Sequence, residues 1–370
     1  MEGNIPVYVG TYTNPILFGG GRVFKGKGEG IYLLSLDLQN GELRLVKTFE
    51  NIENPSFLVF NKENSFLYAV NELKEFQGKP SGSVSSFSIS GTNGDLTFIN
   101  RQPTNGTDPC HVEISLEGTN LYVSNFMSGS LSVFPVKSDG AIGELLQFIQ
   151  YTGSGVHPTM QTGPHAHSLA FTRDGKFALV MNLGADRIMI YKTYGGESQL
   201  SEAEIPFLKT QSGAGPRHCT FSPDGKFCYI INELNSTILV LSYDKETGCF
   251  VELQSVPTLP KGASISGNSC ADIHTTPDGS FLYGSNRGHD SLVIYKINKN
   301  SGLLDYVDCP SCGGKSPRNF AIEPTGNYLL CANLDSNDIV VFKIDQSSGK
   351  LTRLSKLSIP SPVCVKTFSQ

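Results

Sequence analysis

One segment of the chain, PRHCTFSPDGKFCYIINE from Pro216 to Glu233, recurs in imperfect copies along most of its length. The other copies begin at Pro55, Pro109, Ala166, Cys270 and Pro317. Their spacing of roughly fifty residues is typical of propeller blades rather than of helical solenoids. In each copy an apolar run meets a turn, such as Asp224-Gly225, and a β-branched and aromatic run then ends in Asn. Two further strand-like runs follow, so the repeat predicts units of four antiparallel strands.

The two ends of the chain supply the parts of one more unit. The C-terminal stretch PVCVKTFS has the pattern of a first strand without its partners, whereas the N-terminal stretches VYVGTYT and GIYLLSLD have that of second and third strands. Joined in one blade, they would close the ring and leave no unpaired radial edge. We therefore expect an all-β, seven-bladed β-propeller formed as a single domain by residues 1–370, in preference to eight blades or a solenoid.

Charge and hydropathy exclude several functional classes. The chain carries 29 Lys and Arg against 34 Asp and Glu, a net charge of −5, which argues against binding nucleic acid. No apolar run approaches the roughly 20 residues that span a bilayer. The start MEGNIPVYVG lacks the pattern of an export signal. We expect a cytoplasmic protein that binds neither membranes nor nucleic acid; the alternative is export under a leader missing from this sequence. The sequence leaves the oligomeric state open, with a monomer favoured.

The nine cysteines indicate a reducing compartment. Several lie inside predicted strands, where a reduced thiol behaves as a small apolar residue; these are Cys219, Cys228, Cys331 and Cys364. The pair Cys309 and Cys312 has the CxxC spacing of half a zinc site or a redox motif, but no second CxxC or nearby His completes it. We interpret the pair as free thiols in a loop. No metal-ligand spacing is evident in the chain, so we expect no metal and no cofactor, while the Glu and His residues leave assistance by a metal open.

Chemistry at one site of a pseudo-symmetric ring must come from residues that break the repeat. The end of the second strand is Asn in six units and Thr11 in the seventh. These asparagines are Asn71, Asn125, Asn182, Asn232, Asn286 and Asn333. Because Asn supports side-chain-bonded turns, we interpret the whole set as scaffold.

Strand direction predicts which of the remaining side chains can meet. The loop entering the first strand and the loop leaving the second lie on one face, here called the top, and the Asp-Gly turns lie on the other. Entering the first strand are Ser56-Phe57, Cys110-His111, His167-Ser168, Arg217-His218, Ala271-Asp272 and Arg318-Asn319, with His165 just before the third pair. After the repeated Asn come Glu72, Phe126, Leu183, Glu233, Arg287 and Leu334. Because the first strand of a blade is innermost, these side chains should converge at one mouth of the channel and form a concave polar site.

The residue types at this mouth are those that activate water and hold an anion. A carboxylate or imidazole can take a proton, and guanidinium groups bind charge that is present in a substrate or develops at an oxygen. We expect Glu233, His165 or His167, Arg217 and Arg287 to be catalytic. The residues expected to contact substrate around them are His111, His218, Asp272, Arg318 and Glu72.

Several of these residues also have a structural interpretation. His111, His218 and His274 are each compatible with a hydrogen-bonded structural role at a strand start. Glu72 and Asp272 are equally compatible with ion pairs to the arginines of neighbouring blades. We interpret His157 and His289 as solvated loop residues.

The stretches that carry these residues also resemble a known family. GSGVHPTMQTGPHAHS, GPRHCTFSPDGKFCYIINEL, CADIHTTPDGSFLYGSNRGHDSL and SPRNFAIEPTGNYLLCAN are similar to the seven-bladed propeller lactonases, which include a bacterial type of 6-phosphogluconolactonase and a fungal carboxymuconate-cyclising enzyme. The resemblance covers essentially the whole chain. It implies that a His of the PHAH segment, Arg217, Glu233 and Arg287 line the active site. The chain departs from the family at His157, where Asn is frequent, and in a longer loop between Thr13 and Gly30.

That loop leaves the top face. Its Gly19-Gly20-Gly21 run lacks the Gly-Lys-Ser/Thr ending of a phosphate loop and leads into no helix, so we exclude nucleotide binding. Arg22, Lys25 and Lys27 could still reach a substrate phosphate; the alternative is a solvated insertion.

We therefore expect hydrolysis of a sugar lactone, which the resemblance specifies as 6-phosphoglucono-1,5-lactone. Glu233 or a His of the PHAH segment would be the general base, and Arg217 and Arg287 would stabilise the oxyanion or bind anionic groups. The residues alone support only a small anionic substrate. The alternatives are lactonisation of a carboxylated diene acid and a propeller that binds a ligand or partner without catalysis.

Overall fold

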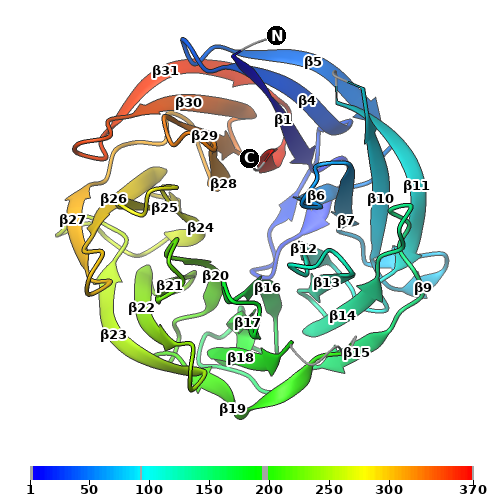
Figure 1. Ribbon diagram of the computed structural model, residues 1–370, viewed down its shortest axis with the longest axis horizontal. Helices are drawn as coiled ribbons and strands as arrows, with labels where there is room; N and C mark the ends of the chain where they lie inside the picture. The colour runs from blue at the N-terminus through cyan, green and yellow to red at the C-terminus, as the bar shows by residue number, and fades with distance from the viewer. Residues whose placement is uncertain (1–2, 92–93, 194–198, 369–370) are drawn as a thin grey trace.

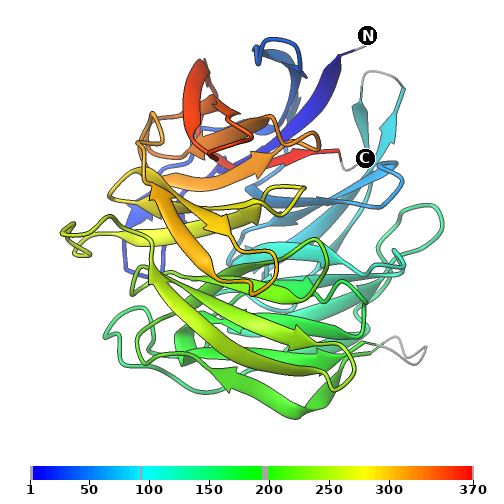
Figure 2. The same cartoon turned by 60° about the vertical axis from the view of Figure 1, so that its left-hand side comes forward.

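The computed structural model describes residues 3–91, 94–193 and 199–368. These residues form a ring of seven four-stranded antiparallel sheets, as Figure 1 shows down the channel and Figure 2 in an oblique view. Blades 1 to 3, from the inner to the outer strand, are β6 (Pro55–Phe60), β7 (Phe66–Asn71), β10 (Ser83–Ser90) and β11 (Asp95–Pro103); β12 (Pro109–Ile114), β13 (Asn120–Asn125), β14 (Ser130–Pro135) and β15 (Gln147–Gln150); and β16 (Ala166–Phe171), β17 (Phe177–Asn182), β18 (Arg187–Lys192) and β19 (Ser201–Lys209).

Blades 4 to 6 follow the same plan. They consist of β20 (Pro216–Phe221), β21 (Phe227–Asn232), β22 (Thr237–Asp244) and β23 (Cys249–Pro257); β24 (Ser269–Thr275), β25 (Phe281–Arg287), β26 (Ser291–Ile297) and β27 (Leu304–Asp308); and β28 (Pro317–Ile322), β29 (Tyr328–Asn333), β30 (Asp338–Ile344) and β31 (Leu351–Ser358). Outside the seven blades, the described residues form two short hairpins, β2 (Ile16–Leu17) with β3 (Val23–Phe24) and β8 (Glu75–Phe76) with β9 (Lys79–Pro80), and one 3-10 turn, η1 (Leu183–Ala185).

Blade 7 is built from both ends of the chain, as the sequence predicts. Its inner strand is the C-terminal β32 (Pro362–Thr367), and β1 (Asn4–Thr11), β4 (Gly30–Asp37) and β5 (Leu43–Glu50) complete it. β32 pairs with β1 from Val7 opposite Thr367 to Thr11 opposite Pro362. The predicted closure of the ring is therefore confirmed.

The hydrophobic core lies between neighbouring blades rather than at the centre of the ring. One cluster joins Tyr8 of β1, Leu67 of β7 and Val123 of β13, all fully buried, and therefore spans blades 7, 1 and 2. In the inner strand β12, for example, Val112 and Ile114 belong to this cluster, whereas the intervening Glu113 and the preceding His111 do not. Outer strands are largely exposed on one side, as in β19. This arrangement leaves the channel free for polar residues.

The repeated asparagines hold the blade corners, as the sequence predicts. Each is buried at the end of a second strand. For example, Nδ2 of Asn125 donates to Oγ of Ser132 at 2.9 Å, and Nδ2 of Asn286 donates to the carbonyl oxygen of Thr258 at 2.9 Å. Thr11 plays the same part in blade 7, where its hydroxyl donates to the carbonyl oxygen of Gly30. These residues are therefore scaffold.

The Asp-Gly turns lie at the opposite ends of the same strands, away from the top face. Asp224 accepts a hydrogen bond from Oγ of Ser222 at 2.6 Å and another from the backbone N–H of Lys226, and Gly225 has φ +74°. A left-handed backbone of this kind favours Gly because a Cβ would be strained. The predicted assignment of the two faces is confirmed.

We expect Asp224→Asn to leave both fold and turnover nearly unchanged. The amide oxygen of Asn can accept the same two hydrogen bonds, and surface substitutions of this kind change the free energy of unfolding by about 0.5 kcal/mol or less. Thermal unfolding and steady-state kinetics of the purified variant would check this. Loss of activity in a well-folded variant would mean that the turn face takes part in function.

Candidate active site

A β-bulge at the start of each inner strand turns one side chain into the channel. In blade 3, for example, Ala166 pairs with Asn182 but Ser168 pairs with Met181, so His167 is the extra residue. Bulges re-aim side chains in this way. The corresponding residues in the other blades are Ser56, Cys110, Arg217, Arg318 and Val363, with the shift in blade 5 falling between Cys270 and Ile273. The bulges therefore build a ring of side chains at the top mouth.

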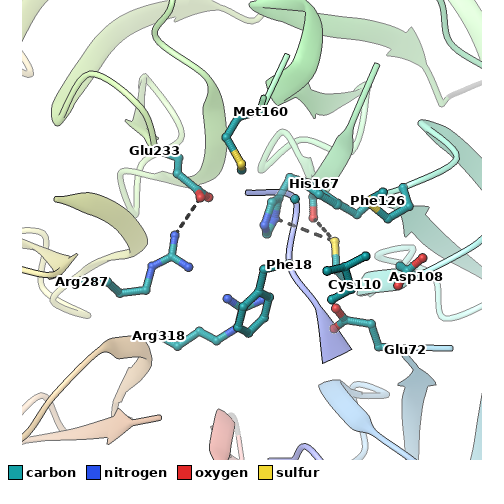
Figure 3. A pocket seen from close by; sticks show the side chains of 13 residues that line it. Phe18, Glu72, Asp108, Cys110, Phe126, Met160, His167, Glu233, Arg287 and Arg318 are labelled. Carbon is teal, nitrogen blue, oxygen red and sulfur yellow. Dashed lines mark hydrogen bonds and ion pairs between the residues drawn. The ribbon is translucent and has the colours of Figure 1, made fainter. Parts of the chain in front are cut away.

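Above this ring lies a pocket (Figure 3). Its lining comprises Leu17, Phe18, Gly19, Glu72, Asp108, Cys110, Phe126, Met127, Met160, His167, Glu233, Arg287 and Arg318. A smaller polar hollow beneath it shares Glu72, Cys110 and Arg318 with the pocket and adds Arg217 and His218. The pocket thus has a charged floor and an upper wall of apolar and aromatic side chains.

Glu233 lies between two arginines. It directly follows β21, and its Oε1 is 3.0 Å from Nη2 of Arg287 at the end of β25. Its Oε2 is 2.9 Å from Nε of Arg217, although the N–H does not point at the oxygen, so this contact is an ion pair rather than a hydrogen bond. Oγ of Ser269 donates to Oε1 at 3.1 Å and also accepts a hydrogen bond from Arg287. The sequence predicts this grouping, and the structure brings these residues together.

Charge around Glu233 makes it a weak base. Burial raises the pKa of Glu233, but Arg287, Arg217 and Arg318 more than offset this, so the pKa lies below its ordinary value. Burial first, and then the neighbouring Arg287, lower the pKa of Arg217 to about 10, which leaves it protonated at neutral pH. Glu233 is thus held as a carboxylate that fixes two guanidinium groups.

Glu72 lies on another side of the same floor. It follows β7, and its Oε2 accepts a hydrogen bond from the hydroxyl of Tyr12 at 3.0 Å. The same hydroxyl accepts a hydrogen bond from Nη2 of Arg318 at 3.0 Å. Burial raises the pKa of Glu72 to about 6, against the opposing effect of Arg318. The raised pKa of Glu72 therefore lies closer to neutral pH than that of an ordinary carboxyl group.

The two histidines of the PHAH segment have different positions. His167 is buried, lines the pocket, and burial followed by the charge of Arg217 lowers its pKa well below the ordinary value, so it is neutral at pH 7. His165 does not line the pocket. Its ring stacks on Phe126 with centroids 4.5 Å apart, and its Nδ1 lies 2.9 Å from the carbonyl oxygen of that residue. The geometry therefore supports His167 as a residue of the active site and places His165 in the wall behind the pocket.

His111, His218 and Asp272 form a second layer, deeper in the channel than the pocket. We expected them at the mouth with the bulged residues, but each follows the bulge and points lower. His218 accepts a hydrogen bond from Nη1 of Arg217 at its Nε2, so its Nδ1 carries the proton and donates to Asp272 at 2.8 Å. Asp272 also accepts from Nε2 of His274 at 3.0 Å. Of these residues, only His218 reaches the smaller hollow, so this layer supports the site from below.

Protons are expected to destabilise the protein through this layer. Burial first, and then Arg217, lower the pKa of His218 to about 4 in the folded protein, whereas the pKa of a His in the unfolded chain is about 6.5. Between these pH values the unfolded state binds more protons than the folded state, so the free energy of unfolding falls as the pH falls. His218 alone accounts for a loss of about 3 kcal/mol. His111 and His167 act in the same direction because burial lowers the pKa of both well below its ordinary value. Urea unfolding at pH 7.5 and pH 4.5 would measure this loss, and His218→Gln should reduce it. Equal midpoints at the two pH values would contradict it.

The basic residues of the long loop are not brought into the pocket. Arg22 is 56% exposed and pairs with Asp335 at 2.7 Å, and Lys25 and Lys27 are exposed. The reason is the hairpin of β2 and β3, which turns Phe18 rather than the charged residues inward, against the rings of Tyr12 and Phe24 and over Arg318. The structure as described therefore gives these three residues no contact with the pocket, and the loop contributes an aromatic roof.

Other residues of the site did not stand out in the sequence. Asp108 and Cys110 flank the start of β12, and Phe126 and Met160 form the upper wall. Met160 is positioned by His157, whose half-buried Nδ1 accepts the N–H of Met160 at 3.1 Å, so His157 is not simply solvated as expected. The repeat alignment does mark the positions of Cys110 and Phe126, but their residue types carry no signal of chemistry.

Several further expectations can be compared with the described residues. Within them, no group of three or more His, Cys, Asp or Glu side chains is arranged to hold a metal ion. No helix in the described part of the chain is long and apolar enough to cross a bilayer. The thiol of Cys309 lies 3.2 Å from Oγ of Ser291, and that of Cys312 lies 3.3 Å from the carbonyl oxygen of Gly314. Both cysteines are free thiols, as we interpreted them.

A ring of seven four-stranded blades with a charged pocket at one mouth defines a β-propeller equipped for small-molecule chemistry. Residues 6–367 match the family described as Lactonase, 7-bladed beta-propeller. The chain therefore belongs to the seven-bladed β-propeller lactonase family, which confirms the resemblance noted in the sequence.

Relatives with known names agree with this assignment. A 6-phosphogluconolactonase of Bacillus subtilis is 35% identical over 364 residues, which are 98% of each chain. A crystal structure of a putative 6-phosphogluconolactonase from Bacteroides fragilis superposes with a TM-score of 0.89 at 34% identity and covers 99% of this chain and 98% of that one. A periplasmic gluconolactonase of Pseudomonas aeruginosa superposes with a TM-score of 0.88 at 31% identity over 98% and 99% of the two chains.

Proposed function

We propose that this chain hydrolyses 6-phosphoglucono-1,5-lactone to 6-phosphogluconate in the pocket at the top of the channel. The observation that carries the proposal is the pocket floor, where Arg287, Arg318, Glu72 and His167 meet within one lactonase fold. The names of the relatives from Bacillus subtilis and Bacteroides fragilis support the substrate. The positively charged guanidinium groups of Arg287 and Arg318 support an anionic substrate.

The chemistry asked of the site is attack of water on the ring carbonyl carbon. Negative charge then develops on the carbonyl oxygen, and the phosphate adds a second centre of charge. Arg287 and Arg318 between them supply N–H donors for these two centres, since both reach the pocket. Arg217 is covered by the pocket floor, so we assign it a positioning role through Glu233 rather than direct contact with substrate. His167 is a neutral hydrogen-bonding partner for substrate or water.

Hydrolysis is favoured over the two alternatives. Lactonisation of a carboxylated diene acid would use the same arginines to hold carboxylates, but the relatives from Bacillus subtilis, Bacteroides fragilis and Pseudomonas aeruginosa are named as 6-phosphogluconolactonases or a gluconolactonase. Perturbed pKa values cluster at functional sites, and the raised pKa of Glu72 in the pocket favours catalysis over binding alone. We further propose a cytoplasmic location and a role in carbohydrate metabolism, which the free thiols and the proposed substrate support.

A panel of three compounds tests the proposal: 6-phosphoglucono-1,5-lactone, glucono-1,5-lactone and a carboxymuconate. Because δ-lactones open spontaneously, rates are measured above the buffer background at matched pH. We expect clear acceleration with the phosphorylated lactone, a lower kcat/KM with glucono-1,5-lactone, and no conversion of the diene acid. Conversion of the diene acid alone would support the cyclising function, and no conversion of any compound would support a binding propeller.

A further inference from the structure

The pocket holds two carboxyl groups, Glu233 and Glu72, in opposite electrostatic situations. Glu233 is saturated by its contacts, since both oxygens face guanidinium groups and Oε1 also accepts from Ser269. Glu72 has a hydrogen bond from the hydroxyl of Tyr12, the hydroxyl of Ser56 also lowers its pKa, and no arginine or lysine forms an ion pair with it among the described residues. In Figure 3 its carboxylate points towards the middle of the pocket, on the side away from Arg287.

We propose that Glu72, rather than Glu233, is the general base that activates the hydrolytic water. The proposal rests on the proposed function and names the residue that moves its proton. It depends on geometry: Glu72 is buried at 6% exposure, lines both the pocket and the smaller hollow beneath it, and, unlike Glu233, is not ion-paired by an arginine among the described residues. A general base must combine such access with a proton affinity suited to neutral pH.

The surroundings of Glu72 fit this role. The titratable and charged groups that face it are Tyr12 after β1, Arg318 of β28, and Asp108 and Cys110 at the start of β12. Arg318 is the cation that acts most strongly on it, and the two share the hydroxyl of Tyr12. The hydroxyl and the guanidinium group therefore stabilise the carboxylate form, while burial and the nearby Asp108 favour the protonated form. This balance keeps both forms accessible, as a proton shuttle requires.

Glu72 can carry every proton that must be moved within the site during the reaction. As the water oxygen bonds to the ring carbonyl carbon, one water proton passes to the Glu72 carboxylate and the carbonyl π electrons move to the carbonyl oxygen, next to Arg318. When the intermediate collapses, the bond from that carbon to the ring oxygen breaks, and the ring oxygen takes the proton from Glu72 and becomes a hydroxyl. The new carboxylic acid loses its remaining proton to solvent, and Glu72 is again a carboxylate.

The pH dependence of kcat/KM tests this assignment. The parent should show an ascending limb with an apparent pKa of about 6, the value to which burial raises the pKa of Glu72. In Glu72→Gln, kcat/KM should fall by roughly a hundredfold or more and the limb should disappear, because a general base contributes about that much. The matched control is Glu75→Gln, an exposed residue of the same loop, which should behave as the parent.

Two further variants exclude a merely structural effect. Tyr12→Phe removes a hydrogen bond that stabilises the Glu72 carboxylate, so the ascending limb should move to higher pH while circular dichroism stays unchanged. Glu233→Gln should lower kcat/KM, but its residual activity should keep the ascending limb of the pH profile. If Glu72→Gln keeps the limb, or Glu233→Gln loses it, Glu72 is not the base. If the parent itself hydrolyses no lactone above background, the proposed function fails and the role of Glu72 fails with it.

Discussion

Deletion of residues 362–370 should strongly destabilise the ring. The deletion removes β32, which pairs with β1 and buries Val363, Cys364 and Val365 between blades 6, 7 and 1. Each such side chain contributes roughly 1.5–3 kcal/mol, so the loss of about 5 kcal/mol or more is comparable with the whole stability of a typical protein, about 5–15 kcal/mol. It also exposes the hydrogen-bonding edge of β1. We expect a Tm lower by about 10 °C or more, or no cooperative transition.

Two controls make this experiment specific. Cys364→Val keeps a buried apolar side chain of similar size in the same strand and should fold normally. A synthetic peptide covering residues 359–370, added to the truncated chain, should restore the transition by supplying the inner strand in trans. An unchanged Tm after truncation would show that the closure contributes nothing to stability. It would also contradict the expectation that residues 1–370 act as one cooperative domain.

Glu233→Gln and Arg287→Lys should each lower kcat/KM by roughly a hundredfold or more while keeping the fold, the scale expected for losing a positioned charged group. The carboxylate of Glu233 lies between Arg217 and Arg287, so the amide leaves two guanidinium groups that repel each other in a buried site. Lys at position 287 keeps the charge but cannot contact Ser269, Cys270 and Glu233 together, as the planar guanidinium does.

Size is nearly preserved in both variants, so circular dichroism and thermal unfolding should match the parent within a few degrees. Asp224→Asn on the turn face is the matched control for a lost carboxylate, and its activity should equal that of the parent. Parent activity in both pocket variants would mean that the lactone is hydrolysed elsewhere.

The architecture could be predicted from the sequence because it is repeated. Six copies of one strand pattern, together with incomplete patterns at both ends, leave few arrangements other than seven blades with a shared closing blade. The repeat also separated the scaffold asparagines from Glu233, Arg217 and Arg287, because position in the repeat predicts the face of the ring. These features depend on local pattern and strand direction, which a sequence contains.

The depth of each side chain in the channel could not be predicted in the same way. Arg217 and His218 are adjacent in sequence, yet the bulge at Arg217 turns one towards Glu233 and leaves the other facing Asp272. On a regular strand the two side chains would point to opposite faces, so the bulge is what lets both face the channel at different depths. Nor could the sequence predict that the long loop turns Phe18 inward and leaves Arg22 with Asp335, because that choice depends on packing against Tyr12.

The raised pKa of Glu72 is likewise a tertiary property. Only the structure shows that Glu72 is buried beside Tyr12, whereas Glu233 forms ion pairs with Arg217 of blade 4 and Arg287 of blade 5. The sequence therefore predicts which residues meet at the mouth but not which of the two carboxyl groups is free to accept a proton.

The most direct test of the central claim is the kcat/KM for 6-phosphoglucono-1,5-lactone, measured above spontaneous hydrolysis, for the parent, Glu233→Gln and Asp224→Asn at one pH. A lactonase site at the top of the channel predicts equal values for the parent and Asp224→Asn and a value lower by roughly a hundredfold for Glu233→Gln. Equal values for all three proteins, or a loss confined to Asp224→Asn, would contradict it.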